Sequence, residues 1–515
     1  MFSFISSKLA LLVQLALAST TFAAHVNYTF NIVNANLAPD GFTRPTVVVN
    51  GQFPGTLIQA NKDDILHITV NNQLTNPLMR RSTAIHWHGL VRSQLLTESV
   101  ALAEDIYSFK GKPLLRMDRL ALHSAPSLRA IRTPMISLSM DRQEPIDPDD
   151  PHKSLYDEDD ANTIIQLGDW YHKPAPGIQA AYLADRTDEP VPDCGTINGV
   201  GRYVRGPRLP WSRINVVRGK RYRLRVINIS AYGSFEFSIE NHPVTIIEVD
   251  GINHVPKTVG GFEIFAGQRY SVVLNANQPV RNYWIRAPMD VKGDSDNDNL
   301  DDELIYAVLH YDGAPNADPT TRADRDADNM LREHELVPLD NPGVPGGTGP
   351  ADRVIDLQYS RSTSGGTKWT FNGIQYHSPN TNTLLKVMAG ATIASDFTPS
   401  EHTIILNHNE TVELRLHGSS NGHVHVIKGE SGPENYVNPP RRDVFGIKSG
   451  TGIIRFRTDN PGPWFLHCHW HLEAGLAVVF AEAPDQIRDG PQAQVIKQEW
   501  LDLCPIYNAL PPELQ

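Results

Sequence analysis

The sequence is short of positive charge. Its 515 residues include 46 Lys and Arg against 58 Asp and Glu, which gives a formal net charge of −12 and an isoelectric point near 5.9. This balance argues against a nucleic-acid partner and is typical of an acidic, soluble protein. Long apolar runs are missing after the first 24 residues, so we expect no later stretch to cross a membrane. Helical periodicity is nearly absent, which disfavours an α-helical fold.

Cysteine is also scarce, with three in the whole chain: Cys194, Cys468 and Cys504. Cys468 stands between two histidines, which predicts a metal ligand rather than half of a disulfide. The other two either pair with each other or have lost other partners. Both alternatives stay open on the sequence.

The N-terminus has the pattern of a secretory signal peptide. One lysine is followed by an apolar run that ends in small residues, which predicts a signal peptide over residues 1–23, cleaved after Ala23 or Ala24. A short membrane anchor is the alternative, but the run is interrupted by Gln14 and is too short to span comfortably. We therefore expect a secreted, extracellular glycoprotein. Three sequons are compatible with this: Asn27, Asn228 and Asn409.

What the chain has in quantity is the pattern of β-strands. Short runs such as ILHITVNNQL and RYSVVLNAN alternate apolar and polar residues, and 38 prolines and 37 glycines break them. This predicts an all-β protein of sandwiches or barrels, long enough for about three domains at roughly 150 residues each. A polar stretch from Asp147 and a Pro/Gly/Asp-rich stretch near 312–352 mark the boundaries. The expected organisation is domain 1 at 24–150, domain 2 at 151–312, a linker at 313–352 and domain 3 at 353–515.

The most informative stretch is WFLHCHWHLEAG near the C-terminus. Successive side chains of a β-strand point to opposite faces, so His467 and His469 would face one way and Cys468 the other. A thiolate with imidazoles suits a mononuclear copper site for electron transfer, and the flanking histidines can hold a second, oxygen-facing cluster. A zinc site, or a buried cysteine among incidental histidines, is the alternative.

A second motif, STAIHWHGL, strengthens the case for copper. His86 and His88 flank Trp87 and would share one face of a strand. Such a pair could also be an exposed strand edge. Two HxH pairs occur far apart in the sequence, and one of them surrounds a cysteine, which argues against an exposed edge at both places.

With these motifs in view, the chain resembles the fungal laccases of the multicopper oxidase family over nearly all of its expected mature length. The resemblance is carried by VVVNGQFPG, STAIHWHGL, GDWYH, NYVNPPRRDV and PGPWFLHCHWHLEAGL. It implies three cupredoxin-like Greek-key domains and about four copper ions. It also implies a monomeric benzenediol:oxygen oxidoreductase that oxidises phenols and aromatic amines by one electron and reduces O2 to water, with lignin degradation as one setting.

The resemblance also implies ligand roles for individual residues. The oxygen-reducing cluster would be held by His86 at the type 2 copper and by His88, His467 and His469 at the type 3 pair. Cys468 and His471 would bind the type 1 copper, with Leu476 at a non-coordinating axial position. Electrons would pass from Cys468 to His467 and His469.

The chain departs from the family pattern in domain 1. Residues 90–146 contain no Trp or Cys, one glycine (Gly111) and one histidine (His123), so the family's WYHSH ligand motif is absent. The similar length and abrupt edges suggest out-of-frame translation or a mispredicted exon. A true diverged insert is the alternative.

Domain 3 departs from the pattern twice. Of the family's HPxHxHGH motif only His423 and His425 remain, so their assignment as copper ligands is weak. Only two residues separate Cys468 from His471, where the family has four, which predicts a turn too short to bring the imidazole back to the thiolate. By the same resemblance Cys504 would lack its domain-1 disulfide partner.

These departures leave alternatives to an active laccase. The first is a cupredoxin scaffold with impaired or no catalysis, because the missing motif would remove ligands from the type 3 pair. A lesser one is a ferroxidase-like multicopper oxidase. The family's substrate carboxylate has no clear counterpart, since the matching loop reads ISAYGSFEF.

Overall fold

The structure is a computed structural model whose described part covers most of domains 2 and 3 and less than half of domain 1. It describes residues 25–59, 65–79, 114–116, 150–290, 297–321, 328–340, 343–417, 435–444, 446–447 and 451–490, with single residues 493, 505 and 509. The predicted signal peptide and nearly all of the aberrant stretch 90–146 lie outside these ranges, as do Cys504 and the histidines at 86, 88, 423 and 425.

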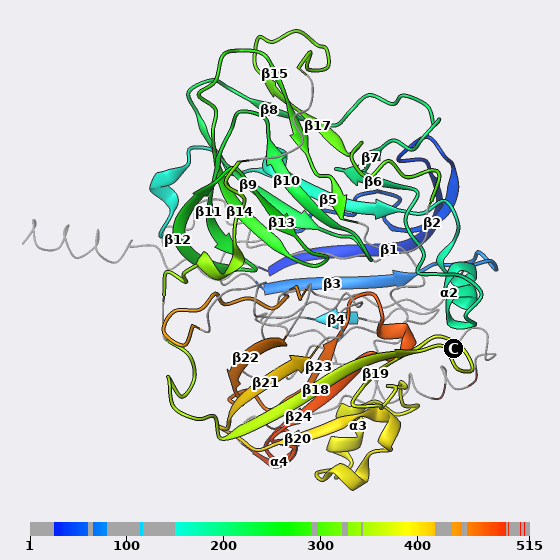
Figure 1. Ribbon diagram of the computed structural model, residues 1–515. Helices are drawn as coiled ribbons and strands as arrows, with labels where there is room; N and C mark the ends of the chain where they lie inside the picture. The colour runs from blue at the N-terminus through cyan, green and yellow to red at the C-terminus, as the bar shows by residue number, and fades with distance from the viewer. Residues whose placement is uncertain are drawn as a thin grey trace, which may run out of the picture.

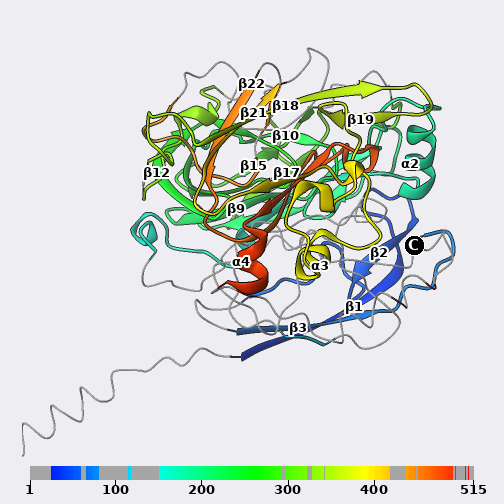
Figure 2. The ribbon, with the colours of Figure 1, turned by 90° about the horizontal axis from the view of Figure 1, so that it is seen from below.

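The described part of domain 1 is a four-stranded sheet in the order β2-β1-β3-β4. Its strands are β1 (His25–Leu37), β2 (Arg44–Val49), β3 (Ile65–Asn72) and β4 (Leu114–Arg116). β1 pairs antiparallel with β2 and parallel with β3. In Figure 1, β1 and β3 lie at a level between the strands of domain 2 above and those of domain 3 below, and Figure 2 shows them on one side of both.

Domain 2 is a sandwich of two sheets. One has the order β13-β10-β15-β17-β8, with β16 on β10, and the other the order β12-β11-β14-β9-β5-β6-β7. The strands of the first sheet are β8 (Arg213–Val216), β10 (Ser234–Ile239), β13 (Gly261–Ile264), β15 (Asn282–Arg286), β16 (Met289–Asp290) and β17 (Tyr306–Tyr311). Those of the second are β5 (Ile164–Trp170), β6 (Cys194–Ile197), β7 (Val200–Gly201), β9 (Arg221–Asn228), β11 (Val244–Val249), β12 (Ile252–Val259) and β14 (Arg269–Asn275). Apolar residues from both sheets form one buried core, as the alternating sequence pattern predicts.

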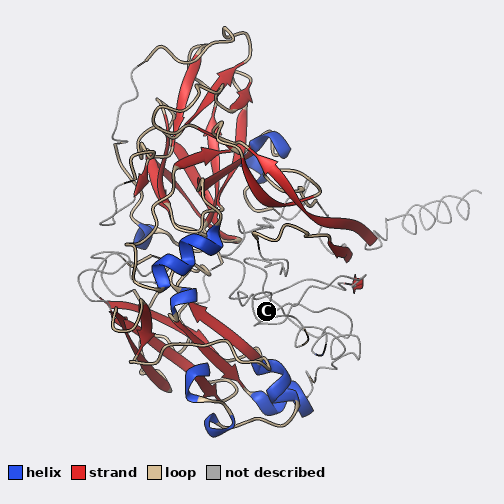
Figure 3. Ribbon diagram, turned by 90° about the vertical axis from the view of Figure 1, so that its right-hand side faces the viewer, coloured by secondary structure: helices blue, strands red, loops and turns tan. Residues whose placement is uncertain are grey.

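Domain 3 also has two sheets, β19-β18-β21-β22 and β20-β24-β23. Their strands are β18 (Arg353–Ser362), β19 (Lys368–Phe371), β20 (Thr403–Leu406), β21 (Thr411–His417), β22 (Thr451–Arg457), β23 (Gly462–His467) and β24 (Ala477–Glu482). The helices of the described chain are short: α2 (Ala175–Leu183), α3 (Thr383–Met388) and α4 (Pro484–Asp489), with 3₁₀ turns between strands. Figure 3 shows domains 2 and 3 as separate blocks of strands, and the all-β prediction is confirmed.

The segment predicted as a linker packs against domain 2 where the structure describes it. Leu336 belongs to the domain-2 core, and the Val255 N–H donates to the Val337 carbonyl at 2.8 Å. Met330 bridges to Gly261 of β13. These residues therefore extend domain 2 rather than separate it from domain 3.

Arg442 ties a domain-3 segment to domain 2. Its guanidinium is almost completely buried and donates to Asp250 Oδ2 at 2.9 Å, to the Tyr270 hydroxyl at 2.9 Å and to the Glu333 carboxylate. Nearby, Arg269 Nη1 lies 2.7 Å from Asp443 Oδ1. The motif NYVNPPRRDV, singled out in the sequence, thus joins two domains.

Helix α2 makes a second connection between domains 2 and 3. It belongs to domain 2, but Tyr182 packs in the domain-3 core, and its hydroxyl accepts from Trp369 Nε1 at 2.9 Å. The Thr367 N–H donates to the Leu183 carbonyl at 3.0 Å. Figure 2 shows α2 beside β19, seen from below. The loop that follows α2 is thereby held against the end of β23.

Candidate metal centre

The loop between β23 and β24 carries the histidine–cysteine motif. The two strands pair antiparallel, with His467 opposite Ala477. Beyond that pair the Cys468 N–H donates to the Leu476 carbonyl, and the Leu476 N–H donates to the His471 carbonyl, both at 3.1 Å. Gly475 closes the loop at φ +103°, where a Cβ would lie 2.2 Å from the Gln375 side chain, so only glycine fits.

This loop brings Cys468 and His471 together. The Cys468 Sγ lies 3.4 Å from His471 Nδ1, and the His471 N–H also points to the sulfur at 3.4 Å. Both side chains are buried. The prediction that the shortened spacing leaves His471 out of reach is wrong: residues 469–471 form a turn that brings the imidazole within 3.4 Å of the cysteine sulfur.

Two residues from other elements lie against the His471 ring. Trp369 stacks on it at a centroid distance of 4.0 Å and an interplanar angle of 26°. Glu189, in the loop after α2, places Oε1 2.8 Å from His471 Nε2. Burial lowers the pKa of His471, but Cys468 and Glu189 outweigh it and raise this pKa to about 9. The raised pKa favours the protonated ring, in which Nε2–H faces the Glu189 carboxylate and Nδ1–H faces the Cys468 sulfur.

His467 and His469 lie outside the core cluster that contains Cys468. Their ring centroids are 6.5 Å apart. His467 Nδ1 lies 3.0 Å from the Cys468 carbonyl, and His469 Nδ1 lies 2.9 Å from the Ala231 carbonyl of domain 2. In a neutral imidazole a donor at Nδ1 places the lone pair at Nε2, so a metal would be bound through Nε2 of each ring.

The carbonyl that meets His469 is fixed by Asp169, from the GDWYH motif. Its carboxylate accepts from the backbone N–H groups of Ala231 at 3.0 Å, Tyr232 at 2.7 Å and Gly233 at 3.2 Å. Burial raises the pKa of Asp169, against the opposing effect of these three donors and of His469. Burial likewise lowers the pKa of His469.

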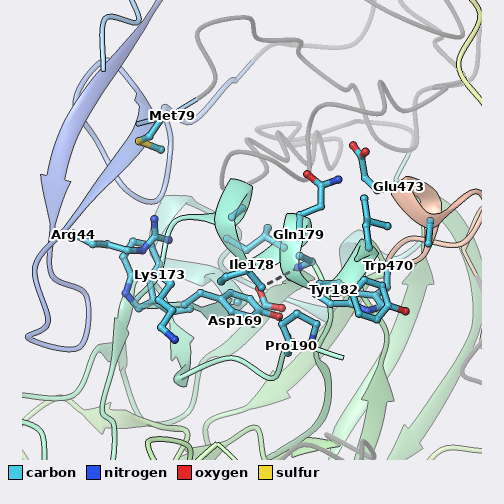
Figure 4. Close-up of a pocket in the computed structure, with 18 of the residues that line it drawn as sticks. Arg44, Met79, Asp169, Lys173, Ile178, Gln179, Tyr182, Pro190, Trp470 and Glu473 are labelled. Carbon is cyan, nitrogen blue, oxygen red and sulfur yellow. Dashed lines mark hydrogen bonds between the residues drawn. The ribbon is translucent and has the colours of Figure 1, made fainter. Parts of the chain in front are cut away.

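A cavity of about 120 Å³ lies behind the histidine–cysteine loop (Figure 4). Its wall combines Met79 of domain 1, Asp169 and Tyr182 of domain 2, and Trp470 of domain 3. Trp470 also packs edge-on against Tyr232 at a centroid distance of 4.9 Å. The loop is therefore enclosed on this side by all three domains.

The described residues hold only part of the predicted ligand set. They contain Cys468, His467, His469 and His471, and Leu476 is completely buried in the same cluster as Cys468. Within the described ranges no group of three or more His, Cys, Asp or Glu side chains lies close enough to hold a metal ion. The remaining predicted ligands, His86, His88, His423 and His425, lie outside those ranges.

His417, at the end of β21, is placed away from this loop. Its Nε2 lies 2.7 Å from Asp356 Oδ1, and its Nδ1 lies 3.2 Å from the Thr451 hydroxyl. It thus bonds to neighbouring strands of its own sheet.

Two predictions on cysteine and glycosylation need correction. Cys194 is a free, buried thiol that lies 3.4 Å from Asp40 Oδ2, so the alternative of a disulfide with Cys504 is wrong. Asn228 is 1% exposed, and its amide donates to the Gly233 and Ile264 carbonyls, which leaves no room for a glycan. Asn27 and Asn409 are exposed, and their sequons remain predictions.

Several residues around the loop were not found from the sequence. Glu189 and Tyr182 come from domain 2, and Trp369 lies about 100 positions before His471. None of the three stands in a motif with the cysteine. Asp169 does stand in a motif, but the motif alone does not reveal that it braces the carbonyl facing His469.

The donor chemistry of this centre fits copper. A cysteine sulfur and an imidazole nitrogen 3.4 Å apart are donor types that suit an electron-transfer copper site, and two further imidazoles lie one residue to either side of the cysteine. No helix in the described chain is long and apolar enough to cross a membrane.

Comparisons with known proteins agree with this chemistry. Three multicopper oxidase family profiles match residues 31–97, 161–314 and 373–486. Laccase-4 of Thanatephorus cucumeris is 49% identical over 92% of this chain and 93% of its own length, and Laccase-2 of Agaricus bisporus is 42% identical over 97% and 98%. Among solved structures, Fet3p, a multicopper oxidase that functions in iron import, superposes with a TM-score of 0.77 at 25% identity, covering 94% of this chain and 96% of its own.

The curated relatives are laccases at much higher identity than the iron-import oxidase, so the laccase assignment is favoured over the ferroxidase-like alternative. The predicted cupredoxin-like domains and copper cofactor are confirmed with it. The chain belongs to the multicopper oxidase family and is of the fungal laccase type, an oxidoreductase that uses copper.

Proposed function

We propose that Cys468 and His471 bind the copper ion that accepts electrons from the substrate. The observation that carries this proposal is the 3.4 Å approach of the thiol sulfur to His471 Nδ1 in a buried, aromatic-walled loop. Leu476, buried in the same cluster as Cys468, would supply no donor atom to a copper ion held there. Copper, when bound there, supplies a one-electron acceptor, and burial shields that centre from water.

His467 and His469 carry the electron onward. Each is joined to Cys468 by one peptide bond, and each holds its Nδ1 on a carbonyl. This fixes both rings with Nε2 available as the metal-binding atom. Together with His86 and His88, and less firmly with His423 and His425, they form the oxygen-facing ligand set in this proposal.

The substrates are phenols and aromatic amines, with dioxygen as the final acceptor. Each phenol loses one electron and one proton, and four such oxidations supply the electrons and protons that turn one O2 into two water molecules. We further propose that the chain is secreted after removal of residues 1–23, carries glycans at Asn27 and Asn409, and works as a monomer.

A cysteine comparison tests the assignment of the electron-accepting site. Cys468→Ser removes the proposed ligand thiolate, whereas Cys194→Ser changes the other buried free thiol, in domain 2. We expect the unmodified protein and Cys194→Ser to show a thiolate-to-copper absorption band and to oxidise phenols. Cys468→Ser should lose the band and phenol oxidation. A band that persists in Cys468→Ser would contradict the proposal.

The alternative of an inactive scaffold rests on the missing WYHSH motif. Copper analysis of the intact protein separates the two: an active laccase holds about four copper ions per chain, and a scaffold one or none. A chain with the thiolate band but without the oxygen-reducing copper ions would accept electrons and pass none to O2.

A further inference from the structure

Glu189 makes a contact that none of the sequence motifs predicts. It stands in the loop after α2, in domain 2, and its Oε1 lies 2.8 Å from Nε2 of His471, in domain 3. The His471 side chain is 1% exposed and the Glu189 side chain 14% exposed. The carboxylate therefore covers the edge of the imidazole that faces away from Cys468.

The chemistry of this contact fixes the state of the ring. An ionised carboxylate only accepts hydrogen bonds, so the ring nitrogen that faces it carries the proton. With the proton at Nε2, the lone pair of a neutral ring lies at Nδ1, the atom that faces the Cys468 sulfur at 3.4 Å. Nδ1 is thus the only ring atom that can bind a metal shared with this thiolate.

The orientation of the ring is fixed as well. Trp369 stacks on its face at 4.0 Å, and the Trp369 Nε1–H donates to the Tyr182 hydroxyl at 2.9 Å. That hydroxyl in turn donates to Glu189 Oε1 at 3.5 Å. Glu189 and Tyr182 of domain 2 and Trp369 and His471 of domain 3 therefore form a closed ring of contacts, made of three hydrogen bonds and one stacked pair.

We infer that Glu189 is a positioning residue that holds His471 in the tautomer and orientation required for binding copper with Cys468. This inference rests on the proposed function, because it assumes that Cys468 and His471 share a copper ion. Carboxylate or carbonyl partners of ligand histidines have this role in other metal sites. Here the partner comes from another domain, so the docking of domain 2 on domain 3 completes the site.

Two substitutions separate the hydrogen bond from other effects. Glu189→Leu removes the acceptor at similar size, and Glu189→Gln keeps a neutral acceptor. Asp188→Asn is the matched control, because Asp188 is the exposed acidic neighbour of Glu189. The copper-free proteins are titrated with Cu(II) against a competing chelator, and the thiolate-to-copper band is recorded. Circular dichroism checks that each variant is folded.

The expected result is a graded loss. Glu189→Leu should weaken Cu(II) binding by about 10–100-fold and shift or weaken the band, as removal of such partners does elsewhere. Glu189→Gln should lose less, and Asp188→Asn should match the unmodified protein. Affinity and band unchanged in Glu189→Leu would overturn the inference. Equal losses in Leu and Gln would also overturn it, since charge rather than the hydrogen bond would then be responsible.

The same titration distinguishes this inference from the proposed function. If the unmodified protein gives no thiolate-to-copper band, the assignment of Cys468 and His471 fails and the role of Glu189 fails with it. If the band is present and the Glu189 variants match the unmodified protein, only the role of Glu189 fails.

Discussion

Replacing Asp169 with asparagine should loosen the domain-2 loop that faces His469. The carboxylate accepts three backbone N–H groups, one through Oδ1, from Ala231, and two through Oδ2, from Tyr232 and Gly233. Asparagine has a single acceptor oxygen. In its better orientation it keeps the two donors at the Oδ2 position and turns its own NH2 toward the Ala231 N–H.

The expected cost follows from this count. Hydrogen bonds to charged groups contribute about 1.5–3 kcal/mol each, and a buried donor left without an acceptor costs about 1–3 kcal/mol. In Asp169→Asn one of the three hydrogen bonds loses its acceptor, and the other two are made to a neutral oxygen instead of a charged one. These changes should together lower the free energy of unfolding by about 2–4 kcal/mol. Because Ala231 also presents its carbonyl to His469, copper held by that histidine should decrease as well.

Urea unfolding of the copper-free protein at pH 8 measures the first effect, and copper analysis of the reconstituted protein measures the second. A high pH is chosen because burial raises the pKa of Asp169, whereas the three N–H donors favour its ionised form. Asp188→Asn, on the exposed loop after α2, serves as the control. An Asp169→Asn variant within about 0.5 kcal/mol of the unmodified protein, the usual range for surface changes, would refute the reasoning.

Two further predictions concern buried charge. Arg442→Met removes the buried cation shared by Asp250 and Glu333, leaving Asp250 with Arg269 at 3.5 Å, and should destabilise the protein by about 3–5 kcal/mol in urea unfolding. The exposed Arg441→Met should change little, and equal effects would contradict this. Burial raises the pKa of Glu482 from 4.5 to about 8, so the folded protein binds the proton of this carboxyl more tightly than the unfolded chain does. The resulting contribution to the free energy of unfolding is fully present below pH 4.5 and is lost as the pH rises through 8. Glu482→Gln should therefore flatten the decrease in unfolding free energy between pH 4.5 and 8, and an unchanged pH profile would count against it.

Much of the fold could be predicted from the sequence because strand alternation is a local property. The runs around ILHITVNN and RYSVVLN became β3 and β14, and the polar and Pro/Gly-rich breaks fall between described sheets. The linker was predicted less well. Its Pro/Gly/Asp-rich composition indicated a linker, but Leu336 inserts into the domain-2 core, and the few apolar residues of this polar stretch give a weak local signal.

The centre was predicted in part, and the reason is again local. Cys468, His467, His469 and His471 stand within one short motif, so residue chemistry and strand parity were enough to single them out. The turn was misjudged because spacing counts residues and not backbone conformation: the turn at residues 469–471 returns the imidazole to the sulfur over only two intervening positions. Glu189, Trp369 and Tyr182 reach the site by domain packing, which the sequence pattern does not encode.

The most direct test is the electron balance of the intact, copper-loaded chain. Phenol oxidation and O2 consumption are measured together, with the copper content of the same sample. The account predicts about four copper ions per chain and about four phenols oxidised for each O2 consumed. A chain that holds one copper ion or none, and consumes no O2 when phenol is added, would contradict it.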